Sequence, residues 1–124
     1  MRKSDARPFI YLTLLFFLFI GTNLYAEDSI IGKWNGTLDA GGAKLRLALT
    51  VTETDSGMKA VLTSIDQGNV DIPVDRISVD AMKVIFEVKA VAGSYSGELN
   101  DEKNEIDGDW TQSGMTFPLV LRKE

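Results

Sequence analysis

The chain has 124 residues, with 18 acidic and 13 basic side chains and neither histidine nor cysteine. Without these two residue types it cannot form Ser-His-Asp or Cys-His nucleophile pairs, zinc sites of the usual ligand type, Fe–S clusters or disulfides. The surplus of acidic groups opposes binding to phosphate backbones and anionic lipid headgroups, so no nucleic-acid partner is expected.

The N-terminal segment has the order of a secretory leader. Residues 1–8 are basic and polar, Phe9–Ile20 is an apolar run, and the small residue Ala26 precedes acidic residues. An uncleaved anchor is the alternative, but the run is shorter than the roughly 20 residues that cross a bilayer. We therefore predict a signal peptide over 1–26, cleaved after Ala26, and a periplasmic or extracellular domain over 27–124 without a stable membrane anchor.

Cleavage at that point also changes the net charge. The leader contains 3 basic residues and 1 acidic residue, so the mature chain has 10 basic and 17 acidic groups, a formal charge of −7. No cysteine follows the apolar run, which excludes an acylated lipoprotein. With no disulfide available in an oxidising compartment, the fold must depend on its apolar core.

Alternation of apolar and polar residues predicts strands along the rest of the chain. Every second residue of 44–52 is apolar, which is the period of a strand with one buried face, and 83–89 and 115–122 repeat the pattern. Pro118 indicates an edge strand or a bulge. The predicted strands are 30–38, 43–53, 58–66, 74–79, 82–90, 93–100, 104–112 and 115–122.

Glycine, asparagine and aspartate separate these runs at short intervals and favour tight turns. Short connections favour antiparallel pairing, and no helical stretch is long enough for a parallel crossover. The sequence therefore predicts one all-β domain, an antiparallel meander of about eight short strands. Closing this sheet leaves few edges unpaired, so we expect a small closed or nearly closed, lipocalin-like barrel.

A motif of the form G-x-aromatic-x-G-x-L occurs in Gly32–Leu38 and Gly93–Leu99, and its first half recurs in Gly108–Trp110. Alternation places its glycines and rings on one face, where a ring can lie over a glycine across the sheet. We expect the rings to pack in the core, with ligand stacking as the alternative. The three aromatic residues are Trp34, Tyr95 and Trp110.

The inward positions of the predicted strands carry mostly bulky side chains, which should fill a barrel of this size. This opposes a deep lipocalin-like cavity, although a Gly-x-Trp near the first strand would suit a lipocalin. The inward set is Trp34, Leu38, Leu45, Leu47, Leu49, Val51, Ala60, Leu62, Val84, Phe86, Val88, Tyr95, Leu99, Ile106, Trp110, Phe117, Leu119 and Leu121.

The third predicted strand is an exception, because its inward alternation becomes polar at Ser64 and Asp66. A carboxylate that enters an apolar interior must find hydrogen bonds or a cation. In one interpretation Asp66 accepts backbone N–H groups, and Ser64 or Gln67 ties down the following link. In the other, Ser64, Asp66, Gln67 and Gln112 form a polar binding patch at one mouth of the barrel.

Several ordered motifs together resemble the N-terminal β-domain of secreted bacterial α/β-hydrolases of the serine-aminopeptidase or esterase-like type. The resemblance covers residues 30–122, but the sequence contains no Gly-x-Ser-x-Gly nucleophile elbow. It therefore implies a stand-alone accessory domain, without the hydrolase activity. The motifs are Gly32-x-Trp34-x-Gly36-x-Leu38, Leu45-Arg46-Leu47, Ala60-x-Leu62-x-Ser64-x-Asp66-Gln67-Gly68, Ile72-Pro73-Val74, Gly93-x-Tyr95-x-Gly97-x-Leu99, Gly108-x-Trp110-Thr111-Gln112-x-Gly114 and Pro118-Leu119.

These observations predict a secreted, non-catalytic accessory or binding module that needs no cofactor or metal. Its partner would be a small ligand or glycan at the Ser64–Gln67 mouth, or another protein such as a hydrolase. A shallow carrier of a small apolar molecule is the alternative, and a carboxylate-based hydrolase is a third hypothesis. The acidic stretch 101–109 lacks the order of a calcium loop and is expected to be a solvated face.

Overall fold

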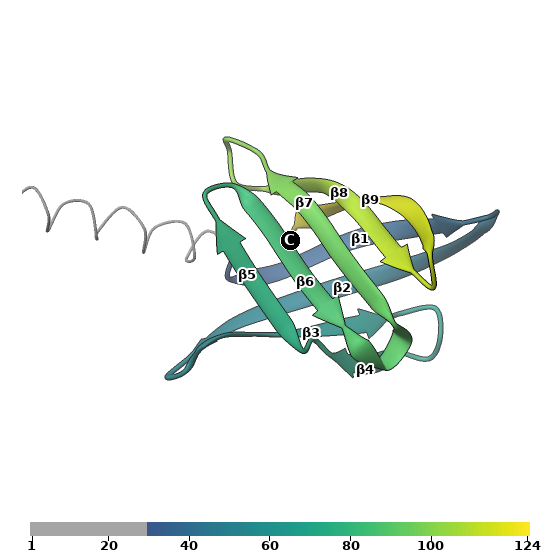
Figure 1. Ribbon diagram of the computed structural model, residues 1–124, viewed down its shortest axis with the longest axis horizontal. Coiled ribbons are helices and arrows are strands. Elements are labelled where there is room, and N and C mark those ends of the chain that lie inside the picture. Colours follow the sequence, from purple (N-terminus) through teal and green to yellow (C-terminus); the bar gives the residue numbers. More distant parts are fainter. Residues whose placement is uncertain (1–29) are drawn as a thin grey trace, which may run out of the picture.

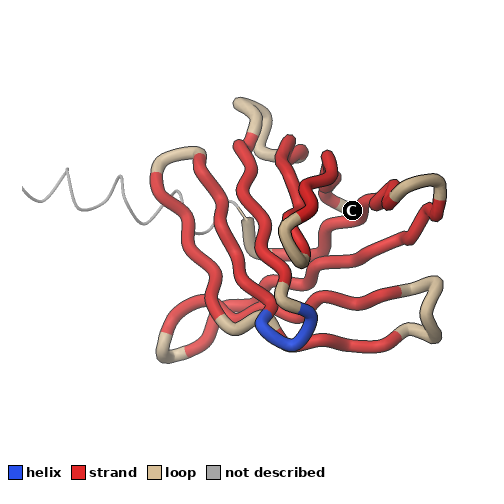
Figure 2. Tube along the Cα trace, turned by 45° about the vertical axis from the view of Figure 1, so that its right-hand side comes forward, coloured by secondary structure: helices blue, strands red, loops and turns tan. Residues whose placement is uncertain are grey.

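The computed structural model describes residues 30–124, which form nine β-strands and one 3-10 turn (Figure 1, Figure 2). The predicted signal peptide and its cleavage site lie outside the described residues. The elements are β1 (Gly32–Ala40), β2 (Ala43–Thr54), β3 (Gly57–Ser64), β4 (Val70–Pro73), β5 (Arg76–Asp80), β6 (Lys83–Val88), η2 (Lys89–Val91, blue in Figure 2), β7 (Gly93–Leu99), β8 (Glu105–Gln112) and β9 (Met115–Lys123).

The strands form one antiparallel sheet in the order β4-β3-β2-β1-β9-β8-β7-β6-β5. Sheet neighbours are also neighbours in the sequence, except for β1 and β9. In Figure 1, β5, β6 and β7 cross in front of β1, β2 and β3, because the sheet curls over on itself around one core. The predicted all-β antiparallel meander is confirmed, and its shape is a curled half-barrel.

The two edge strands, β4 and β5, are consecutive in the chain and meet at a corner. The Val74 N–H donates to the Ala60 oxygen on β3 at 3.1 Å, and the Asp75 N–H donates to the Glu87 oxygen on β6 at 2.9 Å. Two successive residues thus bond to opposite ends of the sheet. This corner brings the ends together and sets the curl of the half-barrel.

The sequence prediction missed β4 and treated residues before 74 as a link. In the structure, Gly68 and Asn69 adopt positive φ angles of 90° and 57° and return the chain directly to β3. Pairing then starts at once, with Val70 opposite Ser64. The tight turn is the reason that the predicted link contains an additional strand, β4, while the predicted strand 74–79 corresponds to β5.

Strands β1 and β9 pair over only two positions, Trp34 with Lys123 and Asn35 with Arg122. Beyond them, β9 pairs with β8 alone, and Pro118 lies in that part. Strand β9 is therefore not an edge strand of the sheet, but Pro118 lies in the part of it that has a paired neighbour on one side alone. A Cβ on Gly36 would lie 2.6 Å from the Val120 oxygen, so only glycine lets β1 approach β9 this closely.

Side chains from both halves of the sheet fill the interior. Of the predicted inward residues, all are buried except Leu45 and Phe117, which are half-buried. The Phe86 ring stacks on Tyr95 with centroids 5.0 Å apart and lies 6.3 Å from Trp110. Aromatic pairs at such separations stabilise a core beyond their buried area. Alternation therefore predicted the core correctly.

Two of the three motif rings lie over glycines, as the sequence predicts. A Cβ on Gly93 would meet the Trp110 ring at 2.2 Å, and one on Gly108 would meet Tyr95 at 2.8 Å. The absence of Cβ atoms therefore provides the space that the rings occupy. The motif of Trp34 differs, because its second glycine, Gly36, lies against the backbone of β9 and not against a ring.

Candidate functional site

A pocket of about 230 Å³ lies at the end of the half-barrel where β1, β3 and β8 end and β2 begins. It brings together four of the residues that sequence analysis selected as candidates, from β3, the turn after it, and β8. They are Ser64, Gln67, Trp110 and Gln112. We call this the mouth pocket, and its lining is Leu38, Leu45, Leu47, Leu62, Ser64, Gln67, Ile72, Val91, Trp110 and Gln112.

Most of the mouth pocket is apolar. Leucines of β1, β2 and β3 line it, together with Ile72 of the edge strand β4 and Val91 of η2. Strand β4 and the β6–β7 connection are not hydrogen-bonded to each other in the sheet order. The pocket therefore lies where the two edges of the sheet are not joined. Apolar side chains that a further strand would cover line the pocket there.

Two hydrogen bonds organise the polar side of the mouth pocket. The Ser64 hydroxyl, on a residue only 3% exposed, donates to Gln67 Oε1 at 2.6 Å, and Trp110 Nε1 donates to Gln112 Oε1 at 3.0 Å. An indole N–H is only a donor, so it fixes the orientation of the Gln112 amide. Both glutamines accept through their oxygens, and within residues 30–124 neither NH₂ group has a hydrogen-bond partner.

Asp66 does not belong to this pocket. The expectation that it continues the inner face of the third strand is wrong, because β3 ends at Ser64 and the chain turns. The carboxylate accepts the Arg46 backbone N–H at 2.8 Å and the Arg46 guanidinium at 2.6 Å. It therefore ties the turn after β3 to β2 on the outside of the sheet, as the first interpretation of this residue expected.

The electrostatics of this pair follow from its geometry. Hydrogen bonds from the side chain and then the backbone of Arg46 hold the pKa of Asp66 below its ordinary value. The same contact raises the pKa of Arg46. Both side chains are accessible to solvent, so the pair contributes less than a buried one would.

The structure does not bring Trp34 or Tyr95 to the mouth pocket. Trp34 is fully buried, donates from Nε1 to the Ile30 oxygen at 2.9 Å, and lies four residues before Leu38, about 13 Å along β1. Tyr95 is 1% exposed. Its pKa is raised by burial and then by the charges of Asp107 and Asp109. Both rings are part of the packed core.

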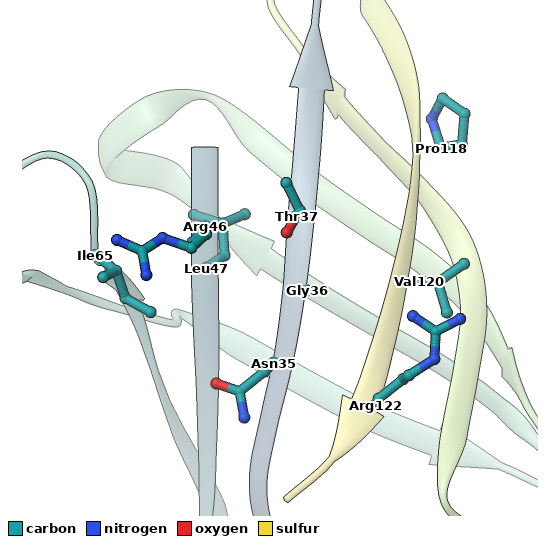
Figure 3. Close-up of a pocket in the computed structure, with 9 residues that line it drawn as sticks. All are labelled: Asn35, Gly36, Thr37, Arg46, Leu47, Ile65, Pro118, Val120 and Arg122. Atoms are coloured by element: carbon teal, nitrogen blue, oxygen red, sulfur yellow. The ribbon is translucent and has the colours of Figure 1, made fainter. Parts of the chain in front are cut away.

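A second concave surface, a trough of about 600 Å³, lies on the outer face (Figure 3). Its lining is Asn35, Gly36, Thr37, Arg46, Leu47, Ile65, Pro118, Val120 and Arg122. In Figure 3, Arg46 and Arg122 lie on opposite sides of β1. Arg46 is paired with Asp66, and Arg122 Nε donates to Glu105 at 3.1 Å.

Sequence reasoning did not find this trough. Alternation identifies Asn35, Thr37 and Val120 as outward residues, but it does not indicate that β1 and β9 separate after two paired positions. The shape of the trough also depends on the contact of Gly36 with the backbone of β9, which joins distant parts of the chain.

No protein-family model matches the chain, and the search of curated proteins found no match. Within the described part of the chain, no three acidic side chains are close enough to hold a metal ion. No helix of residues 30–124 is long and apolar enough to cross a membrane. The lining of the mouth pocket offers apolar contact and hydrogen bonding by two neutral glutamine amides.

Proposed function

We propose that this protein is a secreted, non-catalytic binding module whose ligand site is the mouth pocket. One observation carries the proposal. The mouth pocket combines an apolar lining with two glutamine amides whose NH₂ groups are unpaired among the described residues. Ligand sites typically combine an apolar wall with a few positioned polar groups. Neither Trp110 nor Gln112 titrates near neutral pH, so the pocket offers binding and not acid–base chemistry.

A carrier that encloses an apolar molecule is the competing function. It requires free space along the axis of the half-barrel. Trp34, Phe86 and Tyr95 occupy that interior and are each at most 1% exposed. This packing supports binding at the mouth over enclosure in the core, since a core at native density excludes a ligand unless side chains move.

The outer trough supports a second candidate function, the docking of a protein. Ion pairs with Asp66 and Glu105 hold the two arginines of the trough in place on a protein whose net charge is negative. Arginine is enriched at protein interfaces. With the resemblance to hydrolase β-domains, this favours an accessory role beside a hydrolase. Crosslinking in the periplasm, followed by identification of a defined companion, tests it, and Arg122→Glu should abolish the crosslink.

The ligand proposal is tested by ¹⁵N–¹H NMR of the protein expressed from its full sequence. Titrants are periplasmic extract fractions, fatty acids and cell-wall fragments. A mouth ligand shifts the Trp110 indole signal and the amides of residues 64–68 and leaves the Trp34 indole unchanged. Shifts of both indoles would support the carrier instead, and no shift with any titrant would contradict a small-ligand site.

A pair of matched variants localises the binding. Val91→Trp fills the mouth pocket and should abolish the shifts. Val61→Trp places the same side chain on the outer face of β3, at a position 37% exposed, and should preserve them. Retention of binding in Val91→Trp would place the ligand elsewhere.

A further inference from the structure

We infer that the mouth pocket recognises a neutral group in which a compact aliphatic or cyclic body carries a carbonyl oxygen, as in an amide or ester. This inference rests on the proposed function and assigns the chemical class of its ligand. Three properties of the pocket lead to it: the charge of its lining, the direction of its hydrogen bonds and its size.

The lining carries no charged side chain. An ionised ligand group loses hydration when it enters an apolar pocket, and this loss is large unless an opposite charge replaces the water. Arg46 lies between the lining residues Leu45 and Leu47 in the sequence, but its guanidinium is already bound to Asp66 on the outer face. A neutral ligand avoids the loss of hydration, so the lining selects against both carboxylates and ammonium groups.

Hydrogen bonds within the pocket determine which polar group a ligand needs. The amide oxygens of Gln67 and Gln112 already accept from Ser64 and Trp110. Their NH₂ groups are the polar groups still without partners within residues 30–124, and each offers two N–H donors. The complementary ligand atom is an acceptor with two lone pairs, which describes a carbonyl oxygen.

The volume limits the apolar body. A 150 Å³ apolar cavity accommodates benzene, so by proportion a pocket of about 230 Å³ holds roughly nine non-hydrogen atoms. Drug-sized ligands occupy pockets of about 300 Å³ or more. The pocket therefore fits one ring or branched chain with its carbonyl group, and a longer molecule would extend into solvent.

Three probes with one cyclohexyl body separate the charge states. They are cyclohexanecarboxamide, cyclohexanecarboxylate and cyclohexylmethylammonium, titrated into the ¹⁵N-labelled protein. We expect the carboxamide to shift the Trp110 indole signal and the side-chain NH₂ signals of Gln67 and Gln112. Its dissociation constant should be at least tenfold lower than those of both ions.

Gln112→Glu tests the role of the donor. The glutamate can still accept from Trp110 Nε1, but it has no NH₂ group and adds a negative charge. Affinity for the carboxamide should fall at least fivefold, and the ammonium probe should become the preferred one. Ser78→Glu adds the same charge at an exposed position of β5 outside the pocket. It should change neither the affinity for the carboxamide nor the preference among the three probes. An unchanged Trp34 indole signal shows that each variant is folded.

The outcomes separate this inference from the proposed function. Equal or tighter binding of an ionic probe, or unchanged carboxamide binding by Gln112→Glu, would overturn the inferred ligand class. The proposal that the mouth pocket is a ligand site would still stand. If no probe shifts the pocket signals while a component of the extract does, the class is again wrong. If nothing shifts them, both the class and the small-ligand site are wrong.

Discussion

The hydroxyl of Tyr95 on β7 donates a hydrogen bond to the main-chain oxygen of Leu119 on β9, 2.8 Å away and across the intervening strand β8. The ring reaches that far because it lies over Gly108, where a side chain would occupy its place. One buried phenol thus links β7 directly to β9, two strands that are not neighbours in the sheet.

Tyr95→Phe should lower the free energy of unfolding by about 1–2 kcal/mol, because it removes a donor from a buried carbonyl group. Urea denaturation measures the change. Thr111→Val removes an exposed hydroxyl on neighbouring β8, bonded at 3.1 Å to Thr116, and should change stability by less than about 0.5 kcal/mol. Equal effects of the two substitutions would contradict a special role for the Tyr95 hydroxyl.

Stability should also fall at alkaline pH through Tyr95. Its pKa is raised in the folded protein, while the unfolded chain releases the proton near the ordinary value of 10.0. Ionisation therefore favours the unfolded state increasingly as pH rises above about 10. The stability advantage of the native protein over Tyr95→Phe should be constant at lower pH and shrink above 10. An advantage that stays constant to pH 11.5 would show that the phenol ionises freely.

Gly108→Ala should destabilise the protein by about 3 kcal/mol, since its Cβ would meet the Ser96 oxygen at 2.5 Å and Tyr95 at 2.8 Å. Gly41 provides the comparison, because open space surrounds it but its φ is +64°. Gly41→Ala should cost only about 1 kcal/mol, the strain of that backbone conformation. Thermal and urea unfolding of both variants test whether crowding or backbone strain has the larger effect.

Acid should weaken the Arg46–Asp66 tie. Because the pKa of Asp66 is lowered in the folded protein, its contribution is complete above the ordinary value of 3.8 and is lost as pH falls toward the folded-state pKa. The stability difference between the native protein and Asp66→Asn should therefore diminish below about pH 4. Asp55→Asn, at an exposed turn residue, serves as the control. A difference independent of pH would mean that the charge of Asp66 is not what holds the turn.

The core and the strands were predictable because one physical pattern, alternation with period two, determines both. Trp110 and Gln112 share a face by the same parity, so their meeting at the mouth could be anticipated. The place of Asp66 could not, since it depends on where β3 ends and on an arginine 20 residues earlier in the chain. Alternation also contains no information about a strand such as β4, which is four residues long and ends in Pro73.

The sheet order has a consequence for how the chain folds. Seven of its pairings join strands that follow each other directly, and each can form as a local hairpin. Among the described residues, strands β1 and β9 pair over two positions, Trp34 with Lys123 and Asn35 with Arg122. A hydrogen bond from the Glu124 N–H to the Lys33 oxygen at 2.9 Å and a Lys33–Glu124 ion pair also join these distant segments. Closing so long a loop has a large entropic cost for few bonds. We expect this closure to form last and, in the native state, to open first, so that amide hydrogens near the β1–β9 junction exchange ahead of those in the hairpins.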